Sequence, residues 1–137
     1  METTSSGFRE IEHTADWELH IWAQDMPGLL EQSARGMYAL MGARSAEGER
    51  IAREFELPFW DRESLLVDFL SELLFLTLEE KVLFDEYHLT LDENRLRARV
   101  VGLPLASLTK EIKAVTFHNL KVRETARGLE ANVVFDV

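Results

Sequence analysis

Two segments of the chain alternate apolar and polar side chains at every second position, which is the pattern of a half-buried β-strand. In residues 17–23, four apolar side chains face one way and a mostly polar set faces the other. Trp22 belongs to the polar side, where another element or a partner could cover it. In residues 95–101, three arginines alternate with aliphatic residues. Both segments are therefore predicted to be strands.

Further strands are predicted from shorter or less regular apolar patterns. Residues typical of turns separate them, and Asp92-Glu93-Asn94 and Arg127-Gly128 are expected to connect neighbouring strands. Residues 102–104 break the alternation, residues 44–50 are expected to form a loop, and residues 106–111 are expected to form a short helical turn. The additional predicted strands are 8–11, 51–58, 84–91, 113–122 and 129–137.

Two segments repeat apolar residues at helical spacing. The first follows Asp25, which can cap its N-terminus, and ends at Gly42. The second follows Asp61 and is predicted over residues 62–81. Its apolar positions cover most of its circumference, so we expect it to be the central and most buried helix. Its polar strip is expected to face solvent and consists of Asp68, Ser71 and Glu72.

The order of these elements predicts an α+β fold, with two main helices packed on a mainly antiparallel sheet. A chain of 137 residues has the length of about one domain. We expect residues 1–7 to be a flexible tail and residues 8–137 to be a single domain. The final strand ends on an apolar residue, which predicts that the end of the chain is tied into the sheet.

Composition narrows the classes of function. The chain has no cysteine, which excludes disulfides, thiolate metal sites and a cysteine nucleophile. Neither a signal peptide nor a membrane-spanning run is present, so we expect a soluble, cytoplasmic protein. The net charge of −10 disfavours direct binding to nucleic acid. It suits a basic protein partner or a metal cation, although such a surface can also serve solubility alone.

The chain lacks the common catalytic and phosphate-binding motifs. Its four histidines are scattered singly, and each is expected to be a surface or hydrogen-bonded residue. The arginines at 95, 97 and 99 could bind phosphate, but we expect them to pair with neighbouring carboxylates. Exposed apolar residues are expected only at Trp22 and Trp60.

One polar stretch, Glu12-His13-Thr14-Ala15-Asp16, separates two predicted strands, and a second carboxylate, Asp136, stands next to the last residue, Val137. We expect this polar stretch and the end of the chain to lie next to each other. Carboxylates crowded together must protonate or bind a cation, and oxygen ligands favour Ca²⁺, Mg²⁺ or Mn²⁺ over zinc. The alternative is that Asp16 caps a turn and Asp136 points into water.

Four segments together make the chain resemble the archease family, the accessory proteins of the ligase that joins tRNA halves in splicing and RNA repair. The resemblance covers the chain after its first seven residues. The segments that carry it are His13-Thr14-Ala15-Asp16, residues 66–74 (LVDFLSELL), residues 111–118 (EIKAVTFH) and Phe135-Asp136-Val137.

The resemblance implies an α+β fold without catalytic activity of its own. It implies a divalent-metal site at Asp16 and Asp136, to which Val137 adds its terminal carboxylate, with Ca²⁺ expected first and Mg²⁺ or Mn²⁺ as alternatives. Lys113 matches a position that functions in ligase activation. His13 and His118 lie within the family motifs, as neighbours of the site or at an interface.

From this resemblance we expect a metal-binding accessory factor that promotes guanylylation and multiple turnover of an RNA-splicing ligase. The expected partner is the ligase itself, with no direct contact to nucleic acid or membrane. Two alternatives remain open at this point: a metal-dependent hydrolase or nuclease in its own right, and a general chaperone or modulator protein.

Overall fold

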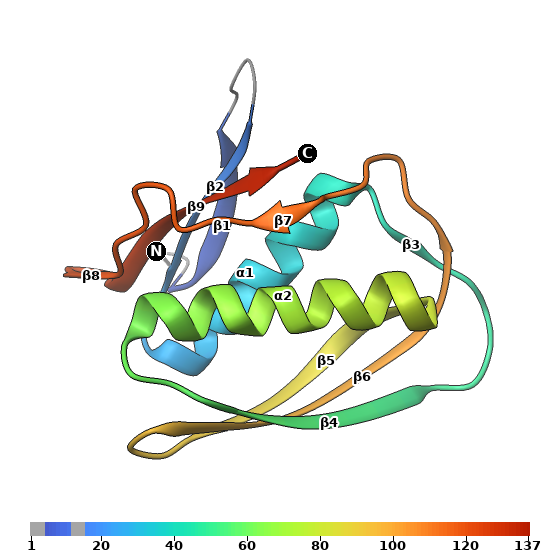
Figure 1. Ribbon diagram of the computed structural model, residues 1–137, viewed down its shortest axis with the longest axis horizontal. Helices are drawn as coiled ribbons and strands as arrows, with labels where there is room; N and C mark the ends of the chain where they lie inside the picture. Colours follow the sequence, from blue (N-terminus) through green and yellow to red (C-terminus); the bar gives the residue numbers. More distant parts are fainter. Residues whose placement is uncertain (1–4, 12–15) are drawn as a thin grey trace.

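The computed structural model describes residues 5–11 and 16–137, and it places two helices between two antiparallel sheets (Figure 1). The predicted α+β class is confirmed, although the strands form two sheets. The helices are α1 (Met26–Met41) and α2 (Arg62–Glu80). The strands are β1 (Gly7–Ile11), β2 (Trp17–Ala23), β3 (Arg44–Ser45), β4 (Ile51–Pro58), β5 (Val82–Leu91), β6 (Arg95–Ser107), β7 (Ala114–Val115), β8 (Arg123–Thr125) and β9 (Gly128–Asp136).

The first sheet is built around β9, the last strand of the chain. Its order is β1-β2-β9-β7, and β8 also pairs with β9. The predicted alternation in β2 is confirmed, because Leu19, Ile21 and Ala23 are buried against the helices. On β9 the buried residues Val133 and Phe135 belong to the same core. The end of the chain is therefore tied into the middle of a sheet, as predicted.

The second sheet is built around β6, which pairs with β3, β4 and β5. The hairpin between β5 and β6 is confirmed, but β6 continues through the expected break at residues 102–104. At Gly102 the neighbouring strand comes so close that a Cβ atom would lie 2.0 Å from the carbonyl oxygen of Leu83. The glycine therefore permits the pairing. The expected loop at 44–50 likewise begins with a short strand, β3.

The helical turn expected at residues 106–111 is wrong. The start of that segment completes β6, and the amides of Thr109 and Lys110 donate to the carbonyl of Met41 at 2.9 and 3.1 Å. That carbonyl lies at the C-terminus of α1, where helix carbonyls lack partners within the helix. The segment therefore closes the end of another helix and does not form its own turn.

The first helix has the predicted boundaries, and the second is capped at its predicted start. Asp25 accepts from the amide of Gly28 at 2.9 Å, and Gly42 ends α1 with a φ of 60°. Asp61 caps α2 by accepting from the amide of Ser64 at 2.7 Å. The second helix ends at Glu80, with Lys81 as its left-handed C-cap. Both N-caps satisfy amides that have no partner within the helix.

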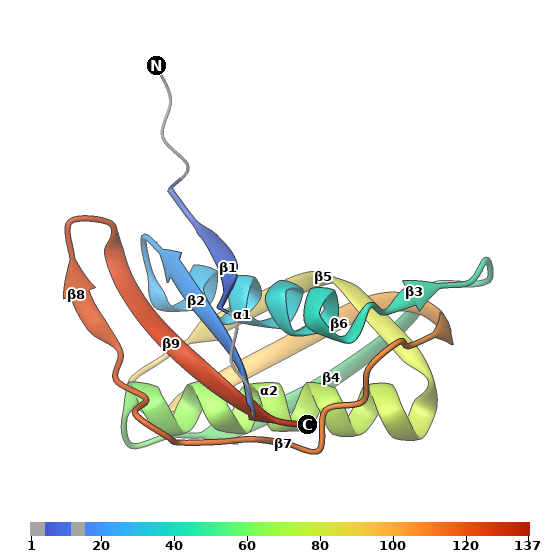
Figure 2. The same cartoon turned by 90° about the horizontal axis from the view of Figure 1, so that it is seen from above.

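The prediction that the second helix is the most buried is wrong. α1 buries 10 of its 16 residues, whereas α2 buries 9 of its 19. α1 lies against both sheets (Figure 2). Its small residues permit this close packing: a Cβ atom on Gly36 would lie 2.7 Å from Cδ1 of Leu19. α2 instead keeps one exposed side, which includes the predicted strip at Asp68 and Ser71.

The strand expected at residues 113–122 is wrong beyond Val115. Thr116 ends it, because its hydroxyl donates to the carbonyl of Val134 at 2.9 Å and accepts from the amide of His118 at 3.2 Å. Asn119 then takes a left-handed backbone conformation with a φ of 52°. A polar side chain that bonds to nearby backbone favours a turn over a continued strand.

The first sheet begins at Gly7, one residue before the predicted strand. His13 and most of the expected tail lie outside the described residues, so the tail stays a prediction. Within residues 5–11 and 16–137, neither helix is long and apolar enough to cross a membrane.

Candidate metal and partner site

Three strands end side by side at one end of the first sheet. Trp17 at the start of β2 pairs with Phe135 of β9, and Ala114 of β7 pairs with Asp136 of β9. The amide of Lys113 donates to the carbonyl of Asp136 at 2.8 Å. Figure 1 shows the C-terminus beside β7. Segments more than a hundred residues apart in sequence thus meet here through backbone pairing.

Alternation along the strands sets the direction of the side chains. Phe135 is completely buried, so the next residue, Asp136, lies on the opposite face of the sheet and is exposed. The register of β2 and β9 ends at Trp17 and Phe135, and if it continued by one residue it would place Asp16 opposite Asp136. Val137 is half-buried and packs against the core. In that register the two aspartates would share the outer face at the end of the sheet.

This arrangement suits an oxygen-coordinated cation. Residues directly opposite each other on antiparallel strands have Cβ atoms about 4.5–5.5 Å apart, and Ca²⁺ binds oxygen at about 2.3–2.6 Å. Carboxylates from Asp16 and Asp136 could thus reach one ion. Among the described residues, no group of three or more histidine, aspartate and glutamate side chains gathers as a metal centre would. A bound ion would therefore draw further oxygen ligands from the terminal carboxylate and from water.

A lysine that sequence reasoning missed lies close to this end of the sheet. The Nζ atom of Lys110 is 5.1 Å from the centroid of the Trp17 ring, a cation–π distance. Lys110 was expected within a helical turn, and no local pattern links it to Trp17. Its position depends on how residues 107–112 cross from β6 to β7, which only the tertiary structure shows.

The histidines take different roles. His118 lies in the exposed turn after β7, and its Nε2 atom is 3.2 Å from the side-chain amide of Asn119. Within the part of the chain that the structure describes, no hydrogen bond or ion pair joins His118 to Asp16 or Asp136. His20 and His88 bond to glutamates at 2.8 and 2.6 Å, which confirms that they are hydrogen-bonded residues.

A polar network covers the outer face of the same sheet further along the strands. Glu130 accepts from the hydroxyl of Thr125 at 2.7 Å and contacts Nε2 of His20 at 2.8 Å. These hydrogen bonds, with that of Thr125 the strongest, lower the pKa of Glu130 from its ordinary value of 4.5. The guanidinium of Arg127 lies 4.5 Å from the ring centroid of Trp22, so another element does cover this tryptophan.

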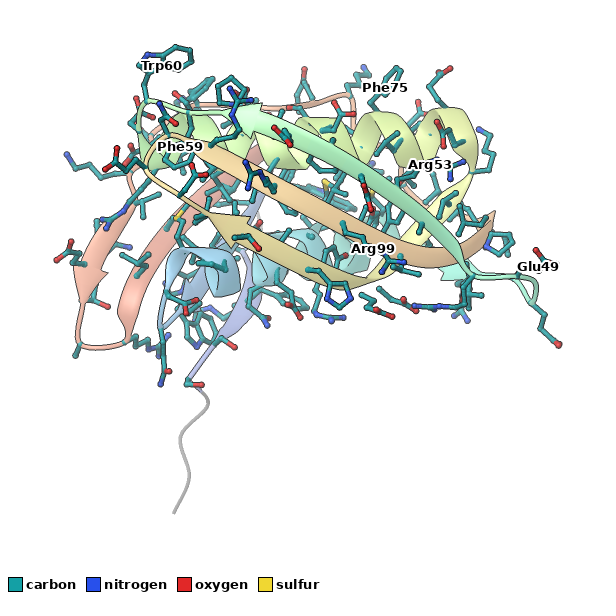
Figure 3. All side chains as sticks on the ribbon, turned by 90° about the horizontal axis from the view of Figure 1, so that it is seen from below. Glu49, Arg53, Phe59, Trp60, Phe75 and Arg99 are labelled. Atoms are coloured by element: carbon teal, nitrogen blue, oxygen red, sulfur yellow. The ribbon has the colours of Figure 1, made fainter. Side chains whose placement is uncertain are left out.

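The row of arginines on β6 pairs with carboxylates, as predicted. Arg95 and Arg97 lie 3.4 and 3.6 Å from Glu56 of β4, and Arg99 lies 3.8 Å from Glu54. All of these side chains are well exposed, so each pair contributes little to stability. Figure 3 shows Arg99 on the open face of the second sheet, and β9 belongs to the other sheet. The arginines are therefore no part of the candidate metal site.

Comparison with known proteins shows the family and the fold of the chain. The model of the Archease protein family (MTH1598/TM1083) matches residues 8–137. The chain belongs to the archease family. It is 32% identical to the protein archease of Methanosarcina barkeri, with 100% of both chains covered, and 28% identical to that of Danio rerio, with 95% of this chain and 85% of the relative covered.

Two solved archease-family structures have the same fold. The solution structure of protein 1598 from Methanobacterium thermoautotrophicum has a TM-score of 0.74 and 28% identity, covering 96% of this chain and 99% of that chain. The crystal structure of an archease from Thermotoga maritima, described as a possible chaperone, has a TM-score of 0.67 and 25% identity, with 94% and 96% covered.

Archease family membership leaves one feature of the surface unexplained. Exposed apolar residues were expected only at Trp22 and Trp60, and this expectation is wrong. Trp60 is 87% exposed, but Trp22 is half-buried, and Phe75 and Phe117 are 59% and 56% exposed. Phe75 stands four residues after Ser71 and three after Glu72, so helical spacing places it on the predicted exposed strip; it was missed because it is itself apolar.

Proposed function

We propose that this archease is a non-catalytic, metal-binding accessory factor that activates an RNA-splicing ligase by promoting its guanylylation and multiple turnover. The observation that carries the proposal is the backbone convergence of Trp17 with Phe135 and of Lys113 with Asp136. Asp16 precedes Trp17 and Asp136 follows Phe135, so this convergence supports a site shared by both aspartates and Lys113. Family membership supports an accessory role.

In this proposal, Asp16, Asp136 and the terminal carboxylate of Val137 hold a divalent cation, with Ca²⁺ preferred over Mg²⁺ or Mn²⁺. When bound, the ion would supply positive charge close to phosphate oxygens. Lys113 would supply a second positive charge from the neighbouring strand. Both charges stabilise the negative charge that develops during phosphoryl transfer.

The acidic surface determines the kind of contact. A net charge of −10 repels RNA phosphates and attracts a basic, RNA-binding enzyme. The chain would therefore act by docking on the ligase protein, and we expect it to do so in the cytoplasm. His118, in the exposed turn after β7, would lie at the rim of this contact.

The test is guanylylation of the purified cognate ligase with GTP, with and without this protein. Asp136→Asn should remove most of the stimulation and weaken binding of Ca²⁺, measured by calorimetry, by about tenfold, because Ca²⁺ affinity follows the number of charged ligands. Asp92→Asn is the matched control, since Asp92 is an exposed aspartate in the β5–β6 hairpin, outside the proposed site. Full stimulation by both Asp16→Asn and Asp136→Asn would refute the metal role.

A chaperone role is the second candidate, because Trp60, Phe75 and Phe117 expose apolar surface. A relative from Thermotoga maritima is described as a possible chaperone. An aggregation assay distinguishes the chaperone role from the accessory role. A chaperone would suppress aggregation of an unrelated, heat-unfolded protein, whereas the accessory factor would act only on the ligase. Incubation with RNA and Mn²⁺ without ligase would reveal cleavage if the protein were itself a nuclease.

A further inference from the structure

A groove lies between α2 and β7, beside the candidate metal site. Its volume is about 320 Å³. Leu74, Phe75 and Leu78 line it from the helix, and Ala114 and Val115 line it from the strand. Phe75 is 59% exposed, which is unusual for a large apolar side chain in the middle of a helix. A concave apolar surface of this kind is typical of a site that another molecule covers.

Carboxylates follow the same side of the helix. Asp68, Glu72, Phe75 and Glu79 recur at the spacing of one helix face, and Glu79 also lines the groove. Among the described residues, none of these three carboxylates forms an ion pair, whereas Glu80, next in sequence to Glu79, pairs with Arg53. Acidic residues at such spacing repel one another along the helix. The stripe therefore offers unpaired negative charge on both sides of one exposed aromatic ring.

The groove is continuous with the candidate site. Lys113 lines it, and the amide of Lys113 is bonded to Asp136. A segment that lies in the groove would thus end next to the carboxylates at the end of β9. Trp60, the most exposed aromatic residue among those described, precedes α2 and lies far from Phe75 along the helix (Figure 3).

We infer that the groove is the docking site for a short segment of a partner protein that carries one large apolar side chain between lysines or arginines. The apolar side chain packs against Phe75, and the cations lie over Glu72 and Glu79. A second copy of this chain is disfavoured, because the net charge of −10 makes two copies repel. RNA is disfavoured because its phosphates would face the carboxylates. Only one part of this inference rests on the proposed function, namely that the partner protein is the RNA-splicing ligase.

The experiment measures binding of two probes by calorimetry. The first is the purified RNA-splicing ligase, and the second is a short synthetic peptide with a leucine between lysines. Phe75→Ser should weaken binding by about tenfold or more, as expected for a central apolar anchor. Trp60→Ser is the matched control, because it removes an exposed aromatic ring outside the groove, and it should leave binding within about twofold. Glu72→Lys combined with Glu79→Lys should also weaken binding, without removing any apolar surface.

The outcomes separate the docking site from the proposed function. Binding of the peptide alone, lost in Phe75→Ser, would support the groove and refute the ligase as partner. If the ligase binds and Phe75→Ser leaves its affinity unchanged, the ligase is supported as the partner, and the groove is refuted as the docking site. If the wild-type protein binds neither probe, both are overturned. A peptide with glutamates in place of its lysines should not bind, and equal binding of both peptides would overturn the charge pattern that we infer.

Discussion

Phe135 is the side chain that holds the three strands of the candidate site together. It is completely buried, it pairs with Trp17 on one side and with Val115 on the other, and it immediately precedes Asp136. Replacing it with alanine leaves a cavity beneath the end of the sheet, since neighbouring side chains collapse only partly into such a space. We therefore expect Phe135→Ala to destabilise the site by removing the packing beneath it, without changing any proposed ligand.

The size of the effect follows from the burial. Replacing a buried phenylalanine with alanine costs about 3–5 kcal/mol. The entropy of unfolding is about 2.1 cal/mol/K per residue, or roughly 290 cal/mol/K for the whole chain. The melting temperature should therefore fall by roughly 10–17 °C. Phe117→Ala makes the same chemical change at a side chain that is 56% exposed, and it should lower the melting temperature by less than about 2 °C.

Calorimetry of both variants gives the melting temperatures, and hydrogen exchange adds a local measurement. The amide of Lys113, which donates to the carbonyl of Asp136, should exchange faster in Phe135→Ala than in Phe117→Ala. Equal shifts in melting temperature for the two variants would contradict the packing described here. An unchanged exchange rate at Lys113 in Phe135→Ala would show that Phe135 does not hold β7 against β9.

Two further predictions concern acid stability and strand packing. Because hydrogen bonds lower the pKa of Glu130 in the folded protein, its stabilisation is fully present above the ordinary pKa of 4.5 and is lost as pH falls through the lower, folded value. Denaturant titrations between pH 7 and pH 3 should show a smaller acid loss of stability in Glu130→Gln, and a curve unchanged from wild type would contradict this. Gly102→Ala should destabilise the protein by about 1–3 kcal/mol, because the new Cβ atom meets the backbone at Leu83, and normal denaturant stability would contradict the close approach.

Local patterns predicted the regular elements well. The alternation in β2 and the caps at Asp25 and Asp61 depend only on residues close in sequence, and the structure places all three as expected. Patterns failed where a distant element determined the backbone. Gly102 was interpreted as a break, but it permits a close strand pair, and Thr116 ends β7 by bonding to a carbonyl of β9.

The candidate site was predicted in part. Asp16, Asp136 and Lys113 came from motifs in the sequence. The structure pairs Trp17, next to Asp16, with Phe135, and bonds the amide of Lys113 to the carbonyl of Asp136. Lys110 could not be predicted, because its contact with Trp17 joins two segments with no shared pattern. The exposure of Phe75 could have been predicted, because Phe75 follows Ser71 and Glu72 of the polar strip at helical spacing, but the groove beside it depends on β7 and could not.

The sequence by itself determined the class of fold, the helix caps and the residues that could bind a cation, because propensity, spacing and side-chain chemistry are local properties. Tertiary structure decided that α1, with its small residues, is the buried helix, and that Phe75 stands at an open groove. It also decided that β9 lies between β2 and β7, which brings the two proposed aspartate ligands to the same end of the sheet. The physical reason is that strand order and helix orientation depend on long-range pairing and on how apolar faces are shared among several elements.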